Sequence, residues 1–421
     1  MTSEQSSEPA AEPAPRGWLN RNILGMGLAS LFSDWNHEMA TAILPVFLST
    51  VLGAPAFALG LIEGVADGVS TLFQIWSGWY SDRIGKRKGL AILGYAVTAG
   101  AKATFALATS WWHVLFGRTV GWIGWSIRSP VRDALLTEST TPATVGRAFA
   151  FHRTLDTLGA ILGPLTAMLL VAHVPLRTIF VISLIPGLCA VFAIVFLVKE
   201  RPRQKIEAHP WASLKALPRD FRKFLVPVGL FGVSNFAPTL LILRAQDLLT
   251  PSLGAVAAAA FAIGLYTFSN VVYALVAYPI GTLADRMSKR IILSTGFALF
   301  GVLCLGFLLA DGHRAFLIVL FALSGVYTAI IESSQPALAS TLMRENEHGT
   351  GFGLMSAVDG LGDFLSSSIV GVLWTLVSPN AGFAAAGVLA LASALMLAGM
   401  RLSRPSEAGS GNVESGNPTT H

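Results

Sequence analysis

The chain has 421 residues, of which 53% are hydrophobic and 13% are charged, and its mean hydropathy is +0.62. Soluble globular chains of this length are less apolar, so most of the chain is expected to lie in lipid. The net charge of +5 does not indicate nucleic-acid binding, because Lys and Arg fall in clusters between apolar runs. No nucleophile elbow, phosphate-binding loop or metalloprotease motif is present, so neither an enzyme nor a cofactor is expected.

Apolar runs bounded by Gly, Pro or charged residues follow one another along the chain, six before a polar stretch and six after it. A helix that spans a bilayer needs roughly 20 apolar residues, and each run is long enough. The runs lie at 23–51, 57–80, 90–109, 112–131, 148–172, 178–198, 223–247, 254–280, 291–310, 315–340, 351–377 and 381–402. The sequence therefore predicts an all-α membrane protein, with twelve transmembrane helices in two pseudo-symmetric six-helix bundles.

The segments between the runs predict the domain boundaries and the orientation. The predicted parts are a disordered tail at 1–21, an N-terminal bundle at 22–198, a linker at 199–222, a C-terminal bundle at 223–402 and a second disordered tail at 403–421. Basic residues gather in the tails, the linker and every second loop. By the positive-inside rule both termini and the linker are expected in the cytoplasm, in a monomeric multi-pass protein of the cell inner membrane.

The two predicted bundles are related by an internal repeat. The segment 78–87, GWYSDRIGKR, reappears at 281–290 as GTLADRMSKR, an offset of 203 residues. The same offset places Asp156 on Asp359 and Gly159 on Gly362. One constant offset in two separate segments indicates a duplicated bundle, with the transport path between the copies.

The 78–88 segment resembles the loop signature between helices 2 and 3 of the major facilitator superfamily. In that family the cluster latches the outward-facing state. The resemblance implies that Gly78 allows close helix packing and that Asp82 accepts hydrogen bonds from a neighbouring helix. The latch residues predicted in this way are Gly78, Asp82, Arg83, Arg87, Arg132, Asp133, Asp285 and Arg286.

Two further motifs resemble those of proton-coupled members of the same family. Gly159, Gly163 and Pro164 are similar to its glycine-rich helix 5 motif, which is associated with proton antiport. Arg118 lies in a segment similar to the arginine motif of helix 4. The resemblance therefore implies a carrier that exchanges protons for a solute.

Carboxylate pairs at helical spacing are the strongest candidates for coupling. Asp34 and Glu38 are four residues apart, as are Glu63 and Asp67, so each pair shares one helix face. Two carboxylates so placed in a membrane repel each other, and a proton on one of them removes the repulsion. Glu63 is expected nearer the periplasmic end, where simple contact with water is the alternative.

Further polar and aromatic residues lie within the predicted spans. Arg153 and Asp156 stand at ion-pair spacing, which suits either an inward gate or a substrate contact. Asp359 repeats Asp156 and is expected to act in a symmetric gate. Trp122 and Trp125 are candidates for stacking on a solute.

The leading hypothesis is a proton-coupled exporter of a small organic compound, with the solute, protons and the lipid bilayer as partners. One alternative is a carrier for divalent metal efflux, and the other is an importer of a small organic anion. The metal ligands would be Asp34, His37, Glu38, Glu63 and Asp67. The anion would be drawn to Arg128, Arg132 and Arg153.

Overall fold

The fold is described from a computed structural model that covers residues 18–84, 87–141, 144–200, 217–344 and 348–401. At residues 75, 78, 79, 81–84, 284, 285 and 348–350 the description extends to the backbone alone. Every regular element in these ranges is helical.

Thirteen α-helices and two short helical turns make up the described chain. They are α1 (Arg21–Val46), η1 (Phe47–Val51), α2 (Ala56–Ile84), α3 (Lys88–Ala103), η2 (Thr104–Leu107), α4 (Trp111–Glu138), α5 (Val145–Leu170), α6 (Leu176–Leu197), α7 (Arg219–Gly232), α8 (Pro238–Leu253), α9 (Ala255–Arg286), α10 (Lys289–Leu309), α11 (Arg314–Thr341), α12 (His348–Leu376) and α13 (Pro379–Gly399). Helices α7 and α8 are two pieces of one predicted span, so the described helices correspond to the twelve predicted spans.

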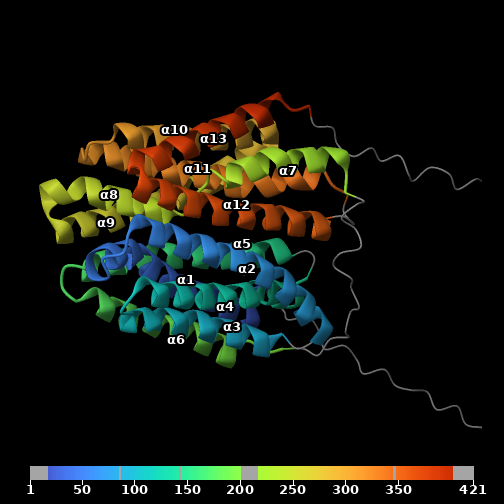
Figure 1. Cartoon of the computed structure of the whole chain (residues 1–421). Helices are drawn as coiled ribbons and strands as arrows, with labels where there is room; N and C mark the ends of the chain where they lie inside the picture. The colour runs from blue at the N-terminus through green and yellow to red at the C-terminus, as the bar shows by residue number, and fades with distance from the viewer. Residues whose placement is uncertain (1–17, 85–86, 142–143, 201–216, 345–347, 402–421) are drawn as a thin grey trace, which may run out of the picture.

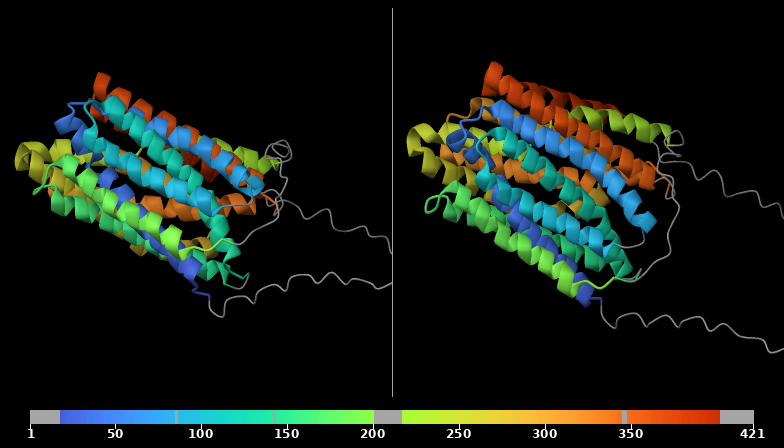
Figure 2. Two further views of the ribbon diagram at one scale, coloured as in Figure 1. Left: turned by 90° about the horizontal axis from the view of Figure 1, so that it is seen from below. Right: turned by 60° about the horizontal axis from the view of Figure 1, so that its bottom comes forward.

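The helices form two halves, α1–α6 and α7–α13, which lie one above the other in Figure 1. Within both halves the helices run roughly parallel to one another, as the two views of Figure 2 show. We call the end of the bundle where α1 begins and α13 ends the terminal side, and the opposite end the far side. The predicted fold of two six-span bundles is confirmed.

Eight of the described helices are long and apolar enough to cross a membrane by length and composition: α2, α3 with η2, α6 and α9–α13. Among the spans left out, α1, α4 and α5 carry charged and polar residues, and α7 and α8 have only 14 and 16 residues each. Helices with buried charges must turn those charges towards protein. The more polar spans are therefore the ones to search for a functional site.

Local sequence signals explain where several helices begin. The Asn20 side chain accepts hydrogen bonds from the backbone N–H groups of Asn22 and Ile23 and so caps α1. Ser378 caps α13 in the same way, with Pro379 at the first helical position. Between α8 and α9 the chain turns at Gly254, whose φ of +76° suits glycine alone.

The break between α7 and α8 differs from the single span that the apolar run at 223–247 predicts. Pro238 begins α8 and disfavours helical backbone at the preceding residue, which is extended. Helix α12 satisfies the backbone groups that the break frees. Ser366 Oγ donates to the carbonyl of Asn235 at 3.0 Å, and the N–H of Ala237 donates to Ser367 Oγ at 3.0 Å. Such partners make irregular backbone tolerable at membrane depth.

The two halves meet along two pairs of helices, α2 with α12 and α5 with α9. Glycines at 60, 64 and 68 form a stripe on α2 that faces α12. A Cβ atom on Gly60 would lie 2.2 Å from the carbonyl oxygen of Ser367, and one on Gly64 would lie 2.6 Å from that of Phe364. The α2–α12 contact is therefore backbone against backbone.

We predict that Gly64→Ala lowers the free energy of unfolding by about 1 to 3 kcal/mol, because the added methyl group forces α2 and α12 apart. The control is Gly89→Ala on α3, where an added Cβ meets nothing within 4 Å. That change is expected to gain up to about 1 kcal/mol from helix propensity. Unfolding in detergent micelles would measure both, and equal stability of the two variants would contradict the packing argument.

Candidate functional site

Arg118 of α4 is the centre of a buried ion pair within the N-terminal half. Its Nη2 and Nε atoms donate to Glu63 of α2 at 2.9 and 3.1 Å, and Nη1 donates to Thr41 Oγ1 of α1 at 2.9 Å. The Arg118 and Glu63 side chains are only 4% and 2% exposed. The pair thus joins three helices, and contact of Glu63 with water is ruled out as its role in this state.

Aromatic side chains cover one side of this ion pair. The Trp122 ring lies 5.6 Å from the Arg118 guanidinium carbon, and its centroid is 5.1 Å from that of His37 on α1. Trp125 packs edge-on against Trp122 at 5.3 Å. The indole N–H of Trp122 and Nδ1 of His37 are buried without a hydrogen-bond partner in the described structure. This wall has free polar atoms, as a binding surface requires.

Glu38 of α1 reaches across to the other half. Tyr266 of α9 donates its hydroxyl to Glu38 Oε2 at 2.8 Å. The face of α1 that carries Asp34 and Glu38 packs on the glycines of α5, because Cβ atoms on Gly159 and Gly163 would lie 3.0 and 2.8 Å from the Cβ atoms of these two acids. The helix 5 motif therefore sets how closely α5 lies against the acidic face.

Asp34 belongs to a second cluster, nearer the terminal side. Arg128 Nη2 lies 3.5 Å from Asp34 Oδ1, and Asp34 interacts electrostatically with Asp156 on α5. Ser30 donates a hydrogen bond to Asp156 at 2.5 Å. The Arg128 guanidinium lies 4.4 Å from the centre of the Tyr95 ring.

Arg153 makes a second contact between the halves on the terminal side. It lies 3.6 Å from Asp156 on its own helix and 3.4 Å from Glu332 of α11, which also accepts a 2.5 Å hydrogen bond from Tyr273. The side chains of Arg153 and Glu332 are 64% and 45% exposed. The predicted pairing of Arg153 with Asp156 is present, and Glu332 extends it across the interface.

The repeat is visible in the contacts as well. Gln335 of α11 donates to Asp359 of α12 at 2.8 Å. Through the 203-residue offset these positions correspond to Arg132 and Asp156, which interact electrostatically in the first half. The copy in the second half thus keeps the carboxylate and replaces the cation by an amide.

The predicted latch is described only in part. Only the backbone is described at four of the predicted latch positions, which are Gly78, Asp82, Arg83 and Asp285. Arg132 forms an ion pair with its neighbour Asp133 at 3.0 Å. Arg87 contacts Glu138 of its own half and, through its backbone N–H, Glu200, which follows α6. Arg286 is exposed at the end of α9. A latch role for this group stays a prediction.

The five residues of the metal hypothesis do not form one cluster. Glu63 binds Arg118, Glu38 binds Tyr266, and Asp34 faces Arg128 and Asp156. Among the described residues no group of three or more His, Cys, Asp or Glu side chains has the geometry to hold a metal ion.

Two residues that complete the site, Thr41 and Tyr266, were not singled out from the sequence, whereas Lys102 stands out there as a lone lysine without a partner. Thr41 and Tyr266 are ordinary residues of apolar helices, and only their partners mark them. Lys102 of α3 is 2% exposed and interacts electrostatically with Asp34 and Glu38, without a hydrogen bond to a described residue. A lone lysine in an apolar run was the available signal for it.

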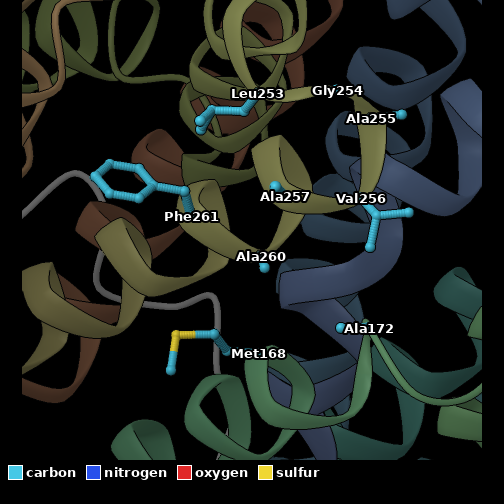
Figure 3. Close-up of a pocket in the computed structure, with 9 residues that line it drawn as sticks. All are labelled: Met168, Ala172, Leu253, Gly254, Ala255, Val256, Ala257, Ala260 and Phe261. Atoms are coloured by element: carbon cyan, nitrogen blue, oxygen red, sulfur yellow. The ribbon is translucent and has the colours of Figure 1, made fainter.

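A groove of about 730 Å³ lies between the halves near the far side. Met168 at the end of α5 and Ala172 form one wall, and Leu253, Ala257 and Phe261 from α8 and α9 form the other (Figure 3). The lining holds no titratable side chain. The groove is therefore separate from the chemistry of the buried carboxylates.

Comparison with known proteins agrees with this architecture. The family model described as Major Facilitator Superfamily matches residues 26–264 and 228–419. The chain belongs to the Major Facilitator Superfamily. It is 32% identical over 384 residues to an uncharacterized MFS-type transporter of Methanocaldococcus jannaschii. The aligned region covers 90% of this chain and 94% of that protein.

Two further proteins extend the comparison. The multidrug resistance protein MdtG of Escherichia coli is 25% identical over 313 residues, covering 70% of this chain and 74% of that protein. The crystal structure of a mutant of the nucleoside transporter NupG superposes with a TM-score of 0.74 at 14% identity, over 89% of this chain and 98% of that one. The structural match supports the fold of this superfamily member.

We predict that Glu63→Gln destabilises the protein by about 3 to 5 kcal/mol, because it leaves the Arg118 charge buried and unpaired. The double variant Glu63→Gln with Arg118→Gln is expected to regain most of that loss. Unfolding in detergent micelles measures the three proteins. Asp220→Asn, which breaks a partly exposed pair with Lys223, is the control and is expected to cost less than about 1 kcal/mol. A double variant as unstable as the single one would refute this account.

Proposed function

We propose that this protein exports a small organic compound from the cytoplasm in exchange for protons, with both termini on the cytoplasmic side of the inner membrane. The observation that carries the proposal is the hydrogen bond from Tyr266 to Glu38, which ties a half-buried carboxyl group of one half to the other half. A carrier that works by alternating access must make and break contacts between its halves. Here such a contact depends on a group that binds protons.

The chemistry of this bond links protonation to movement. As a carboxylate, Glu38 accepts a charge-assisted hydrogen bond, which is roughly twice as strong as a neutral one. Arg118 and Lys102 also interact electrostatically with Glu38. A proton on Glu38 weakens the bond to Tyr266 and so lowers the cost of separating α1 from α9. Proton binding thereby biases the equilibrium between the two states of the carrier.

The contacts between the two halves support a conformation that is open on the terminal side. Towards the far side the halves touch at several points, among them Phe57 N–H to Thr375 Oγ1 at 2.9 Å and Gln246 to Ser49 at 3.5 Å. Towards the terminal side the described link is the exposed pair of Arg153 and Glu332. Solute would enter from the cytoplasm in this state, which agrees with export.

The proposed direction of transport rests on one relative and on the glycine motif of α5. MdtG is named a multidrug resistance protein, and the glycine-rich segment at Gly159 and Gly163 resembles the antiporter motif. Neither alternative function gains a specific observation. The arginines of the anion hypothesis already face carboxylates, since Arg128 is near Asp34, Arg132 near Asp133 and Arg153 near Glu332.

Replacing Glu38 by Gln is expected to reduce solute flux driven by a pH gradient to background, because the amide cannot take up the proton. The measurement uses proteoliposomes with a pH-sensitive dye inside, to which a panel of organic cations and nucleosides is added. Asp311→Asn, at an exposed loop position, is the matched control and is expected to behave as wild type. Full pH-driven flux in Glu38→Gln would exclude Glu38 as a coupling residue.

Tyr266→Phe removes the donor and leaves the ring. A hydrogen bond to a charged group contributes about 1.5 to 3 kcal/mol, so the balance between the two states should shift by roughly 10- to 100-fold. We expect accessibility on the far side to rise, as shown by faster labelling of a cysteine placed at Ser49. Labelling at an unchanged rate would contradict a role for this bond in closing the far side.

A further inference from the structure

Two acidic residues from opposite halves lie in the α2–α12 interface. Close contacts fix the register of these antiparallel helices, because Gly60 meets Gly371, Gly64 meets Phe364 and Thr71 meets Gly360. This register places Asp67 of α2 and Asp363 of α12 on the two facing helix surfaces between the last two of these contacts, and the charge of Asp67 acts on Asp363.

The surroundings of this pair are mostly acidic. Glu63 and Arg118 interact electrostatically with Asp67 from the N-terminal half, and Asp359 and the Tyr327 hydroxyl interact with Asp363 from α12 and α11. The guanidinium of Arg118 already binds Glu63 and Thr41. Among the described residues no cation forms an ion pair with Asp67 or Asp363.

The internal repeat supplies a comparison within the same molecule. The 203-residue offset carries Asp67 to Asn270 and Ala160 to Asp363, so the α5–α9 interface is the counterpart of α2–α12. There the Asn270 amide donates to the carbonyl oxygen of Ala160 at 2.9 Å. An amide can donate at any pH, whereas two carboxyl groups can form a hydrogen bond only with a proton between them.

We propose that one proton shared by Asp67 and Asp363 holds α2 against α12, and that its loss opens this interface. The proposal deepens the proposed function, on which it rests for the part that protons play in transport. With the proton present, one carboxylic O–H donates to the other carboxylate and the pair carries a single negative charge. After the proton leaves, the pair carries two, and the glycine-packed backbones hold them close enough to repel.

The test follows the distance between α2 and α12 directly, without any solute. Nitroxide labels are placed at Leu72→Cys and Leu361→Cys, next to the Thr71–Gly360 contact, in a background with Cys189→Ser and Cys304→Ala. These leucines are 69% and 60% exposed, so the labels disturb little packing. Electron paramagnetic resonance in nanodiscs then gives the distance distribution between the two labels as the pH is raised.

The molecule offers a symmetry-matched control. The same offset carries Leu72 to Leu275 and Leu361 to Leu158, which are 70% and 44% exposed on α9 and α5. We expect the separated population of the 72–361 pair to grow roughly tenfold between about pH 5 and about pH 9. This is the effect of one proton whose binding constant differs about tenfold between the closed and the separated state. The distance of the 158–275 pair should change less with pH, because an amide that donates at any pH holds that interface.

Asp67→Asn places on α2 the residue that occupies the equivalent position on α9, and it should keep the 72–361 pair close at every pH. A constant 72–361 distance in the wild-type background would overturn the proposal, as would a pH response that survives in Asp67→Asn. So would equal movement of both label pairs, or a response to replacing sodium by choline at fixed pH. Loss of pH-driven flux is measured separately in Glu38→Gln, so failure of the proposed function is distinguishable from failure of this inference.

Discussion

The structure depends on one constraint, which is that a charge inside a membrane must find a partner within the protein. Arg118 meets it with Glu63 and Thr41, and Arg128 meets it with Asp34 and the face of Tyr95. These contacts cross from one helix to another, so the same charges that are costly in lipid also fix how α1, α2 and α4 pack. Polar function and helix arrangement therefore have a common physical origin in this half.

In the second half, uncharged side chains make contacts at two positions where the first half has charged ones. Gln335 binds Asp359 where the first half has Arg132 near Asp156, and Asn270 binds a backbone carbonyl where the first half has Asp67. The Asn270 contact does not change with pH, because neither of its partners titrates. Most of the acidic groups of the site therefore lie in α1, α2 and α5, and α12 of the second half adds Asp359 and Asp363.

The hydrophobic periodicity and the internal repeat predicted most of the fold. The apolar runs predicted the spans, and the four-residue spacing placed Asp34 and Glu38 on one face, where the structure has them packed on α5. The interaction partners of these side chains could not be predicted, because spacing along the chain does not determine which helices are neighbours. Arg118 and Glu63 are 55 residues apart in sequence. Tyr266 gave no signal, as one tyrosine in an apolar helix is more often a packing residue. The break before Pro238 did have a signal, the run Ser-Asn-Phe-Ala-Pro, which the hydropathy of the segment hid.

The divided span of α7 and α8 has a mechanical consequence. Helix α7 packs on α12 and α13, whereas α8 is joined to α9 through Gly254 alone and packs against it. Hydroxyl groups of Ser366 and Ser367 steady the joint between the two pieces, and such bonds re-form readily after a small rotation. We propose that this joint lets α8 change its angle to α7 together with α9 when the far side opens, while α7 stays packed on α12 and α13.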